Sequence, residues 1–184
     1  MNSLIIVAHP KKESFSFAMA KKYIELAKEK GYNIEFIDLY REKNQQPFFN
    51  FDNANKMEKT SEMEYYQEKI KWADELVFIF PYWWGGMPSI LKNFFEWNLS
   101  KGFAFTYVNS RPKGLLTNKS VKVYTTTGAP SFIYKITGAN RRIRKTMQQQ
   151  IFSFCGMKLT SFNIYGGLDK SASNPSAILK KMKI

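Results

Sequence analysis

The sequence contains very few of the residues that build disulfides and metal sites. It has one cysteine, Cys155, and one histidine, His9. A single cysteine cannot form an intrachain disulfide, which fits a reducing compartment, and one histidine with one cysteine cannot supply a usual zinc ligand set. The apolar neighbours of Cys155 predict a buried and unreactive thiol. We therefore expect neither a disulfide nor a bound metal ion.

Long hydrophobic runs are missing as well. No segment approaches the ~18–20 consecutive apolar residues that a membrane span requires. The apolar run at residues 4–8 is too short for a signal peptide and has no basic region before it. The sequence therefore predicts a cytoplasmic protein with no stable membrane insertion.

Acidic residues are scarce, with 15 Asp and Glu against 28 Lys and Arg and a net charge of +13. Most lysines are spread along the chain, as on solvated helix faces, but Arg141, Arg142, Arg144 and Lys145 form a denser cluster. A positive field steers anionic ligands such as dinucleotide phosphates towards a protein. Nucleic-acid binding is not expected, because no recognisable nucleic-acid motif accompanies the charge.

What the sequence does contain is a regular alternation of short apolar runs and helical patterns. Strands are expected at residues 4–8, 33–38, 75–80, 121–127 and 159–165, and helices at residues 15–30, 64–72, 88–99, 141–154 and 175–182. The polar stretch from residue 41 to residue 61 is expected to be a long surface excursion. This order predicts one domain over residues 1–184. Its α/β fold should be a flavodoxin-like, doubly wound, five-stranded parallel sheet of strand order 2-1-3-4-5, with helices on both faces.

Three loops are candidates for a ligand site, because open α/β sheets bind ligands outside the carboxyl ends of their strands. These loops are residues 9–17, 81–86 and 125–134. The first offers hydroxyls at a helix start, which suits a phosphate, although a capped helix with solvated lysines explains it equally well. Because there is no GxGxxG or Walker sequence, a standard dinucleotide fold or P-loop is not indicated.

The other two loops have different chemistry. The second has three aromatic residues followed by two glycines, so that rings can flank a planar ligand and the backbone can approach it closely. For one of its tryptophans, packing in the core is the alternative interpretation. The third loop ends a strand with small residues whose amides suit developing negative charge, or it is an ordinary turn. A serine hydrolase is not expected, because no serine lies in a nucleophile-elbow motif.

Taken in order, these segments resemble the NAD(P)H:quinone oxidoreductase family of flavodoxin-like proteins, in its short bacterial form. The matching motifs run from residue 4 to about residue 167 and comprise residues 4–9, Ser14-Phe15, Phe80-Pro81 with Trp84 and Gly86, residues 103–107, Thr126-Thr127-Gly128 with Tyr134, and residues 154–156.

The resemblance implies a flavin enzyme with a ping-pong mechanism. NAD(P)H would donate hydride to flavin N5 and leave, and a quinone or related electrophile would then take two electrons at the same site. The loop at residues 9–15 resembles that of members that bind FAD, so we expect FAD rather than FMN. The resemblance also implies a homodimer with its flavin sites at the subunit interface.

Site residues follow from the same resemblance. The flavin phosphates would contact His9, Ser14, Phe15, Ser16 and Ala18. The flavin ring would lie on Pro81, Tyr82, Trp83 and Trp84, with Thr126, Thr127, Gly128, Ala129 and Tyr134 near its pyrimidine end. The catalytic candidates are Tyr107, Tyr134 and Asn140.

The sequence departs from the family pattern at three positions. Asn140 stands where larger members carry a histidine with a proton-relay role, and asparagine donates a hydrogen bond but cannot titrate. Phe105 replaces a second tyrosine, so Tyr107 is the only phenol in that segment, and Ser16 replaces a common asparagine. We therefore expect the protons for the acceptor to come from water or from Tyr107.

An apparent surplus of aromatic residues also favours the dimer. The 16 Phe, 10 Tyr and 4 Trp are more than one small core should require, and aromatic residues are enriched at interface centres. The residues expected there are Phe94, Phe95, Trp97, Phe103, Phe105 and Tyr107.

Two other functions fit the same fold. Some short relatives are regulatory subunits that bind and activate potassium-efflux transporters, and the basic surface would suit docking, although nothing in the sequence selects this function. A flavodoxin-type one-electron carrier is the other, but such carriers are usually acidic, and the charge of +13 argues against it.

Overall fold

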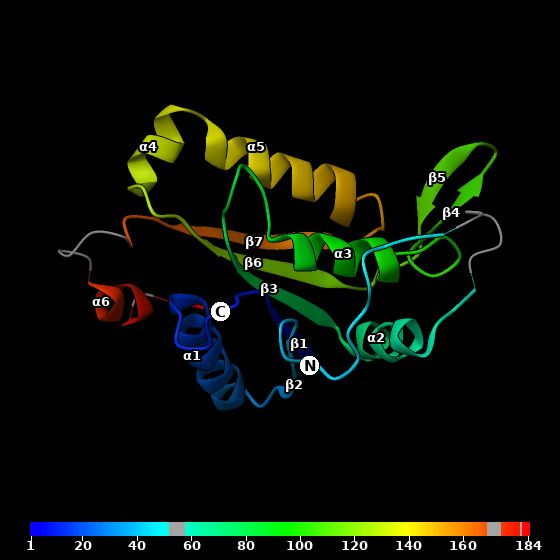
Figure 1. The fold of residues 1–184 in the computed structure, drawn as a ribbon, viewed down its shortest axis with the longest axis horizontal. Coiled ribbons are helices and arrows are strands. Elements are labelled where there is room, and N and C mark those ends of the chain that lie inside the picture. The colour runs from blue at the N-terminus through cyan, green and yellow to red at the C-terminus, as the bar shows by residue number, and fades with distance from the viewer. Residues whose placement is uncertain (52–57, 169–173, 181) are drawn as a thin grey trace.

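The computed structural model describes residues 1–51, 58–168, 174–180 and 182–184. Its main element is a five-stranded sheet in the order β2-β1-β3-β6-β7, in which each neighbouring pair is parallel (Figure 1). The strands are β1 (Asn2–Val7), β2 (Asn33–Asp38), β3 (Glu75–Pro81), β6 (Ser120–Thr126) and β7 (Lys158–Tyr165). When only these strands are counted, the order is the predicted 2-1-3-4-5.

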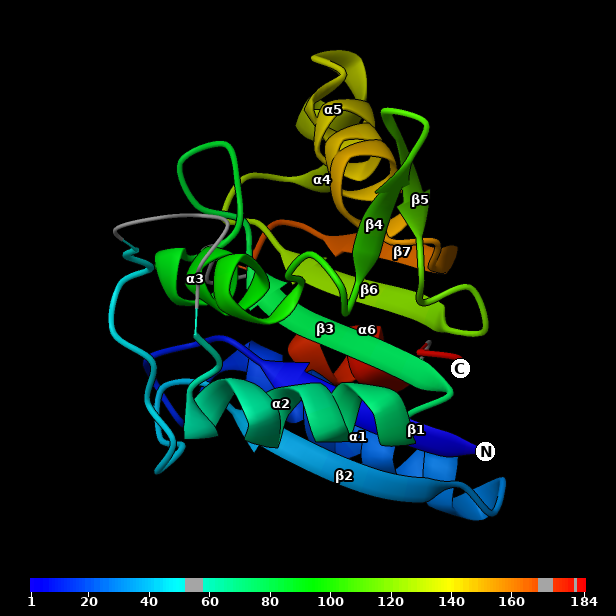
Figure 2. The same ribbon diagram turned by 90° about the vertical axis from the view of Figure 1, so that its right-hand side faces the viewer.

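Helices cover both faces of the sheet (Figures 1 and 2). One face carries α1 (Phe15–Glu29) and α6 (Pro175–Lys180), and the other carries α2 (Ser61–Trp72), α3 (Ser89–Asn98) and α5 (Ala139–Thr146). Because side chains alternate along a strand, Ile5 and Val7 of β1 enter the core under α1, whereas Leu4 and Ile6 enter the opposite core. The doubly wound arrangement is confirmed. No helix within the described ranges is long and apolar enough to cross a bilayer.

The helix ends follow their capping residues. Ser14 caps α1, since its Oγ accepts a hydrogen bond from the Phe17 amide at 3.4 Å. Gly31, with φ of +72°, follows the C-cap residue Lys30 and ends α1 where the sequence predicts. Helix α2 begins one turn earlier than predicted, because Thr60 Oγ1 accepts from the Met63 amide at 3.2 Å.

Three elements were not predicted from the sequence. Strands β4 (Phe105–Val108) and β5 (Arg111–Gly114) form a separate antiparallel ribbon, and α4 (Ser131–Ile136) precedes α5. The ribbon turns at Asn109 and Ser110, which both have positive φ, and Pro112 lies in its second strand. Such short elements carry too few residues for a periodic pattern. The helix expected at residues 141–154 is α5 followed by a π-helical segment, Met147–Phe152.

The base of the ribbon is tied to the chain beyond that π-helical segment. The Leu116 amide donates to the Cys155 carbonyl at 2.9 Å. Gly114 lies so close to Gly156 that a Cβ on Gly114 would stand 2.1 Å from the Gly156 nitrogen. Cys155 is 2% exposed, and burial raises the pKa of its thiol to about 11. The prediction of a buried thiol is confirmed.

The polar stretch after β2 has no regular structure where it is described, but it is fastened to α3. Asn93 accepts from the Phe49 amide at 2.8 Å and donates to the Pro47 carbonyl at 2.9 Å, and the Trp97 indole donates to the same carbonyl at 2.8 Å. The prediction of a surface excursion is therefore confirmed up to residue 51. Residues 52–57 lie outside the described part.

The aromatic residues of α3 belong to the chain's own core. Phe94, Phe95 and Trp97 are only 3%, 5% and 7% exposed. Phe95 packs edge-on against Phe78 of β3 at 5.0 Å between ring centroids. The prediction that these residues exceed the needs of one core is wrong. Among the aromatic residues expected at the interface, Tyr107 is the one that is mostly exposed, at 52%.

The amino ends of the strands hold a buried polar network. Glu75 of β3 is 2% exposed, and its carboxylate accepts from Ser3 Oγ at 3.2 Å and from the Tyr23 hydroxyl. The other carboxylate oxygen pairs with Lys122 Nζ at 2.8 Å. Burial, followed by the hydrogen bond and charge of Glu75, raises the pKa of Tyr23. Every member of this network has a partner inside the protein.

Candidate functional site

The three loops selected from the sequence meet at the carboxyl ends of the strands. The His9 ring, after β1, lies 5.6 Å from the Trp83 ring, after β3. The Tyr82 amide donates to the Thr126 carbonyl at 2.7 Å, which joins the end of β3 to the end of β6. The Tyr82 ring packs edge-on against Tyr134 at 5.6 Å. The structure therefore brings residues of all three loops into one site.

The start of α1 supplies hydrogen-bond donors to this site. Ser16 is 1% exposed, and its hydroxyl has no hydrogen-bond partner among the described residues. The first turn of α1 contains no acidic side chain. A buried hydroxyl without a partner is costly, and the N-terminus of a helix attracts anions. The Ala18 amide instead donates to the Ser14 carbonyl, so it is not available to a ligand.

His9 lies at the same end of α1. Its Nδ1 accepts from the Lys11 amide at 3.0 Å. Burial, followed by the charges of Arg41 and Lys11, holds the pKa of His9 below its usual value, although a hydrogen bond from the protonated ring to the Lys11 carbonyl, also 3.0 Å from Nδ1, acts the other way. The ring is therefore neutral at neutral pH and acts as a hydrogen-bonding group rather than as a fixed charge.

The second loop closes as a tight two-residue turn. Trp83 and Gly86 exchange backbone hydrogen bonds of 3.0 and 2.9 Å. The two central residues, Trp84 and Gly85, have φ of +49° and +79°. Positive φ at both positions defines a type I′ turn, and it strains a residue such as tryptophan. Trp84 is fully exposed and Trp83 is 41% exposed, so neither tryptophan packs in the core.

The third loop is fixed by backbone bonds to the end of β7. The Thr127 amide donates to the Tyr165 carbonyl at 2.8 Å, and the Gly167 amide donates to the Ala129 carbonyl at 3.0 Å. Thr127 Oγ1 donates to the same carbonyl at 3.0 Å. Within the described part of the chain, the amides of Gly128 and Ala129 make no hydrogen bond. These two amides are therefore free to bind the edge of a ring.

Tyr134 and Asn140 both line a pocket of about 320 Å³ between α4, α5 and β7. Asn140 Oδ1 accepts from the Arg141 amide at 2.7 Å, which leaves its Nδ2 group as the donor for a ligand. The sequence predicted these two residues but missed Phe162 and Ile164, the part of β7 that forms the apolar wall. The basic cluster that begins at Arg141 was a signal that could have marked this pocket.

Tyr107 is not brought to the site within one chain. Helix α3 runs back along β3, so the ribbon that follows it lies towards the amino ends of the strands, opposite α4 (Figure 1). The Tyr107 ring contacts Phe105 at 5.9 Å and lies 6.0 Å from Lys101 Nζ. Its proposed contact with the flavin therefore requires a second copy of the chain.

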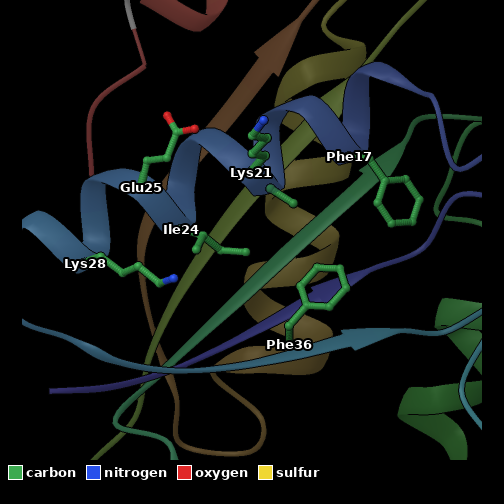
Figure 3. Close-up of a pocket in the computed structure, with 7 residues that line it drawn as sticks. Phe17, Lys21, Ile24, Glu25, Lys28 and Phe36 are labelled. Carbon is green, nitrogen blue, oxygen red and sulfur yellow. The ribbon is translucent and has the colours of Figure 1, made fainter.

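A second hollow, of about 360 Å³, opens between α1 and the edge strand β2 (Figure 3). Phe17, Ile24 and Phe36 form its apolar part, with Lys21 and Lys28 beside them. Sequence reasoning missed it, although Phe36 is an apolar residue in a strand that forms the edge of the sheet.

The donors at the three loops fit a flavin nucleotide. The unpartnered Ser16 hydroxyl and the start of α1 suit a phosphate. The exposed rings of the second loop suit a planar system, and the free amides of Gly128 and Ala129 suit its polar edge. Among the described residues there is no cluster of three or more His, Cys, Asp or Glu side chains that could hold a metal ion.

Comparisons with known proteins agree with this fold. Residues 1–183 match the family model described as flavodoxin-like fold. An uncharacterized NAD(P)H oxidoreductase of Haemophilus influenzae is 33% identical over 172 residues, which cover 91% of this chain and 85% of that protein. The NAD(P)H dehydrogenase [quinone] 1 of Rattus norvegicus is 31% identical, over 85% of this chain and 65% of its own length.

Among solved structures, the crystal structure of Smu.1420 from Streptococcus mutans UA159 is similar along almost the whole chain. It has a TM-score of 0.78 and 32% sequence identity, and the match covers 98% of this chain and 96% of that one. The chain is thus similar to proteins of its own length and to about two thirds of the rat enzyme.

Proposed function

The chain belongs to the flavodoxin-like family of NAD(P)H oxidoreductases, and on this premise we propose that its three loops bind a flavin through which quinones or related electrophiles are reduced. The observation that carries the proposal is the buried Ser16 hydroxyl in the first turn of α1, which has no hydrogen-bond partner in the part of the chain that the structure describes. Ser16 follows the loop whose His9 ring meets Trp83. We expect the enzyme to be cytoplasmic and to take its electrons from NADH or NADPH.

Each loop has its own task in this proposal. Ser14, Ser16 and the start of α1 bind the phosphate groups of FAD, which we expect rather than FMN. Trp83 and Tyr82 hold the ring and keep water from its face. The amides of Gly128 and Ala129 donate to the edge of the ring where negative charge develops. The flavin itself supplies the acceptance of a hydride from the nicotinamide and the delivery of two electrons to the acceptor.

The proton supply distinguishes this chain. Asn140 offers its Nδ2 group to the acceptor oxygen and orients it, but asparagine has no proton to release. The hydroxyl of Tyr134, beside Asn140 in the same pocket, adds a second hydrogen bond. Because Asn140 cannot titrate, we expect the protons to come from water or from Tyr107.

The role of Tyr107 makes the dimer part of the function. Because its own chain holds Tyr107 away from the loops, only a second copy can present it to the site. Large apolar side chains are exposed on both surfaces involved: Trp84, Phe132 and Ile136 at the loops, and Tyr107 and Val108 on the ribbon. Burying such side chains in a symmetric dimer would stabilise the assembly.

Anaerobic stopped-flow kinetics test the proposal. The purified protein should carry a flavin, identified by mass, that NADH or NADPH bleaches and a quinone reoxidises. Tyr107→Phe should slow reoxidation by the quinone more than it slows reduction by NAD(P)H. Gly128→Val should lower the flavin content of a folded protein by crowding the ring edge.

Three results would count against this scheme. A folded protein that binds neither FAD nor FMN would contradict the proposed function. Full flavin occupancy in Gly128→Val would contradict the proposed position of the flavin ring. A fully active monomer in light scattering at micromolar concentration would remove the dimer and the role of Tyr107 together.

A further inference from the structure

One group of charges has no task in the flavin site. Lys135, Arg141 and Arg144 line the pocket between α4, α5 and β7. None of the three belongs to an ion pair among the described residues. The described residues that line the pocket include no acidic side chain. Three unpaired cations around one cavity create a positive field that favours an anion.

The other walls of the pocket suit an aromatic molecule. Phe162 and Ile164 give it an apolar side, while Tyr134 and Asn140 add a phenol hydroxyl and an amide. A pocket of about 320 Å³ has room for one ring system with its substituents. That volume is at the small end of ligand sites, which span ~300–1,000 Å³, and it is too small for a whole dinucleotide.

The pocket adjoins the flavin site through Tyr134. The Tyr134 ring lines the pocket and also packs against Tyr82 of the second loop, at 5.6 Å between centroids. A ligand in the pocket therefore lies next to the place proposed for the flavin ring. An anionic group held by Arg141 and Arg144 would fix how the rest of that ligand is oriented towards the flavin.

We propose that this pocket binds the anionic group of a redox substrate, a carboxylate, sulfonate or phosphate, and so selects anionic substrates over neutral ones. The inference rests on the proposed function. The same chemistry has two sources, an anionic quinone and the 2′-phosphate of NADPH. These sources act in different half-reactions, so kinetics can separate them.

The acceptor half-reaction is tested with two quinones of the same ring size, 1,4-naphthoquinone-2-sulfonate and 2-methyl-1,4-naphthoquinone. Arg144→Gln should lower kcat/KM for the sulfonate about tenfold more than for the methyl compound, the size of one lost charge-assisted hydrogen bond. Lys145→Gln is the matched control, since Lys145 is the adjacent cation on the same helix but does not line the pocket. Lys145→Gln should leave the ratio of the two kcat/KM values within about twofold, as expected of a screened charge outside the pocket.

The donor half-reaction is tested in the same variants with NADPH and NADH. If the pocket holds the 2′-phosphate, Arg144→Gln should slow flavin reduction by NADPH about tenfold more than reduction by NADH, and the quinone ratio should stay constant. Binding of redox-inert naphthalene-2-sulfonate, measured by calorimetry on the flavin-loaded protein, gives a readout without turnover. The Kd of naphthalene-2-sulfonate should rise about tenfold in Arg141→Gln and in Arg144→Gln but not in Lys145→Gln.

These outcomes separate the inference from the proposed function. One outcome is that the protein reduces 2-methyl-1,4-naphthoquinone while Arg144→Gln changes neither the ratio of the two quinones nor the ratio of NADPH to NADH. That result would support the proposed function and contradict the anion-binding pocket. A protein that reduces no quinone loses the function, and the calorimetric comparison alone then decides the pocket. Equal changes in Arg144→Gln and Lys145→Gln would show a general charge effect and would also overturn it.

Discussion

The two ends of the sheet treat buried polar groups in opposite ways. At the amino ends, Glu75, Lys122, Tyr23 and Ser3 satisfy one another inside the protein. At the carboxyl ends, the Ser16 hydroxyl is buried without a partner among the described residues, and nearby aromatic rings are exposed. A closed network holds a fold together, whereas unpartnered donors beside exposed rings are the condition of a binding site. The difference predicts opposite effects of similar substitutions.

The largest effect should come from breaking the closed network. Lys122→Met leaves the Glu75 carboxylate buried without its cation, which should cost about 3–5 kcal/mol of unfolding free energy. Urea denaturation measures the loss. Lys92→Met is the control, because the Lys92–Glu96 pair is solvent-exposed and its loss should cost at most ~1 kcal/mol. Equal losses in the two variants would show that the network is not what stabilises the amino end.

Gly114 and Gly86 extend the comparison from charge to packing, because they differ in the room available for a side chain. A Cβ at Gly114 would meet backbone at 2.1 Å, whereas a Cβ at Gly86 would meet nothing within 4 Å. Gly114→Ala should therefore cost about 3 kcal/mol, the upper end of overpacking effects, measured by thermal denaturation. Gly86→Ala should leave stability nearly unchanged and act, if at all, on flavin affinity. A stable Gly114→Ala protein would contradict the close packing at the base of the ribbon.

Ser16 and Ser3 test whether the carboxyl end of the sheet serves binding and the amino end serves stability. Ser16→Ala removes a hydroxyl that has no partner among the described residues, so it should weaken flavin binding by about 2 kcal/mol, roughly thirtyfold, without loss of stability. Ser3→Ala should do the reverse, because its hydroxyl donates to Glu75. Fluorescence titration of the flavin-free protein and urea denaturation give the two readouts. If Ser16→Ala lowered stability and kept full flavin affinity, the phosphate site would lie elsewhere.

The smallest effect concerns Cys155 at the packed base of the ribbon. Burial raises the pKa of its thiol from 9.0 to about 11. The thiol therefore ionises first in the unfolded chain, so its contribution to stability is complete below pH 9 and is lost as the pH rises through 11. At pH 10 the loss should be about 1.4 kcal/mol relative to neutral pH. Cys155→Ala should show a smaller loss over the same range, and identical pH profiles would contradict the shift.

Most of the sheet could be predicted because its signals are local. The apolar run of β3 and the capping residue Ser14 act within a few residues of themselves, and both predictions are confirmed. The three site loops followed from the strand ends alone. The ribbon was missed because its strands have four residues each and one contains Pro112.

Contacts between distant residues could not be predicted in the same way. Tyr23 and Glu75 are 52 residues apart, and no local pattern shows that a tyrosine of α1 will meet a glutamate of β3. The burial of Phe94, Phe95 and Trp97 was misjudged for the same reason, because a count of aromatic residues does not show how many the core accepts. The place of Tyr107 depends on the unpredicted ribbon, so its distance from the loops became visible only in the structure.

The base of the β4–β5 ribbon is closely packed, whereas its tip is exposed to solvent. This difference determines where residues can be inserted without disturbing the fold. At its base, a larger residue at Gly114 would force the two backbone segments apart, and a larger residue at Gly156 would be strained by its φ of +85°. At its tip, Asn109 and Ser110 are exposed and turn the chain in two residues. Residues inserted at such a tip extend the ribbon into solvent without disturbing the register at its base. Insertions between positions 109 and 110 should therefore be inherited easily, whereas a change at position 114 should survive only with a compensating rearrangement at position 156.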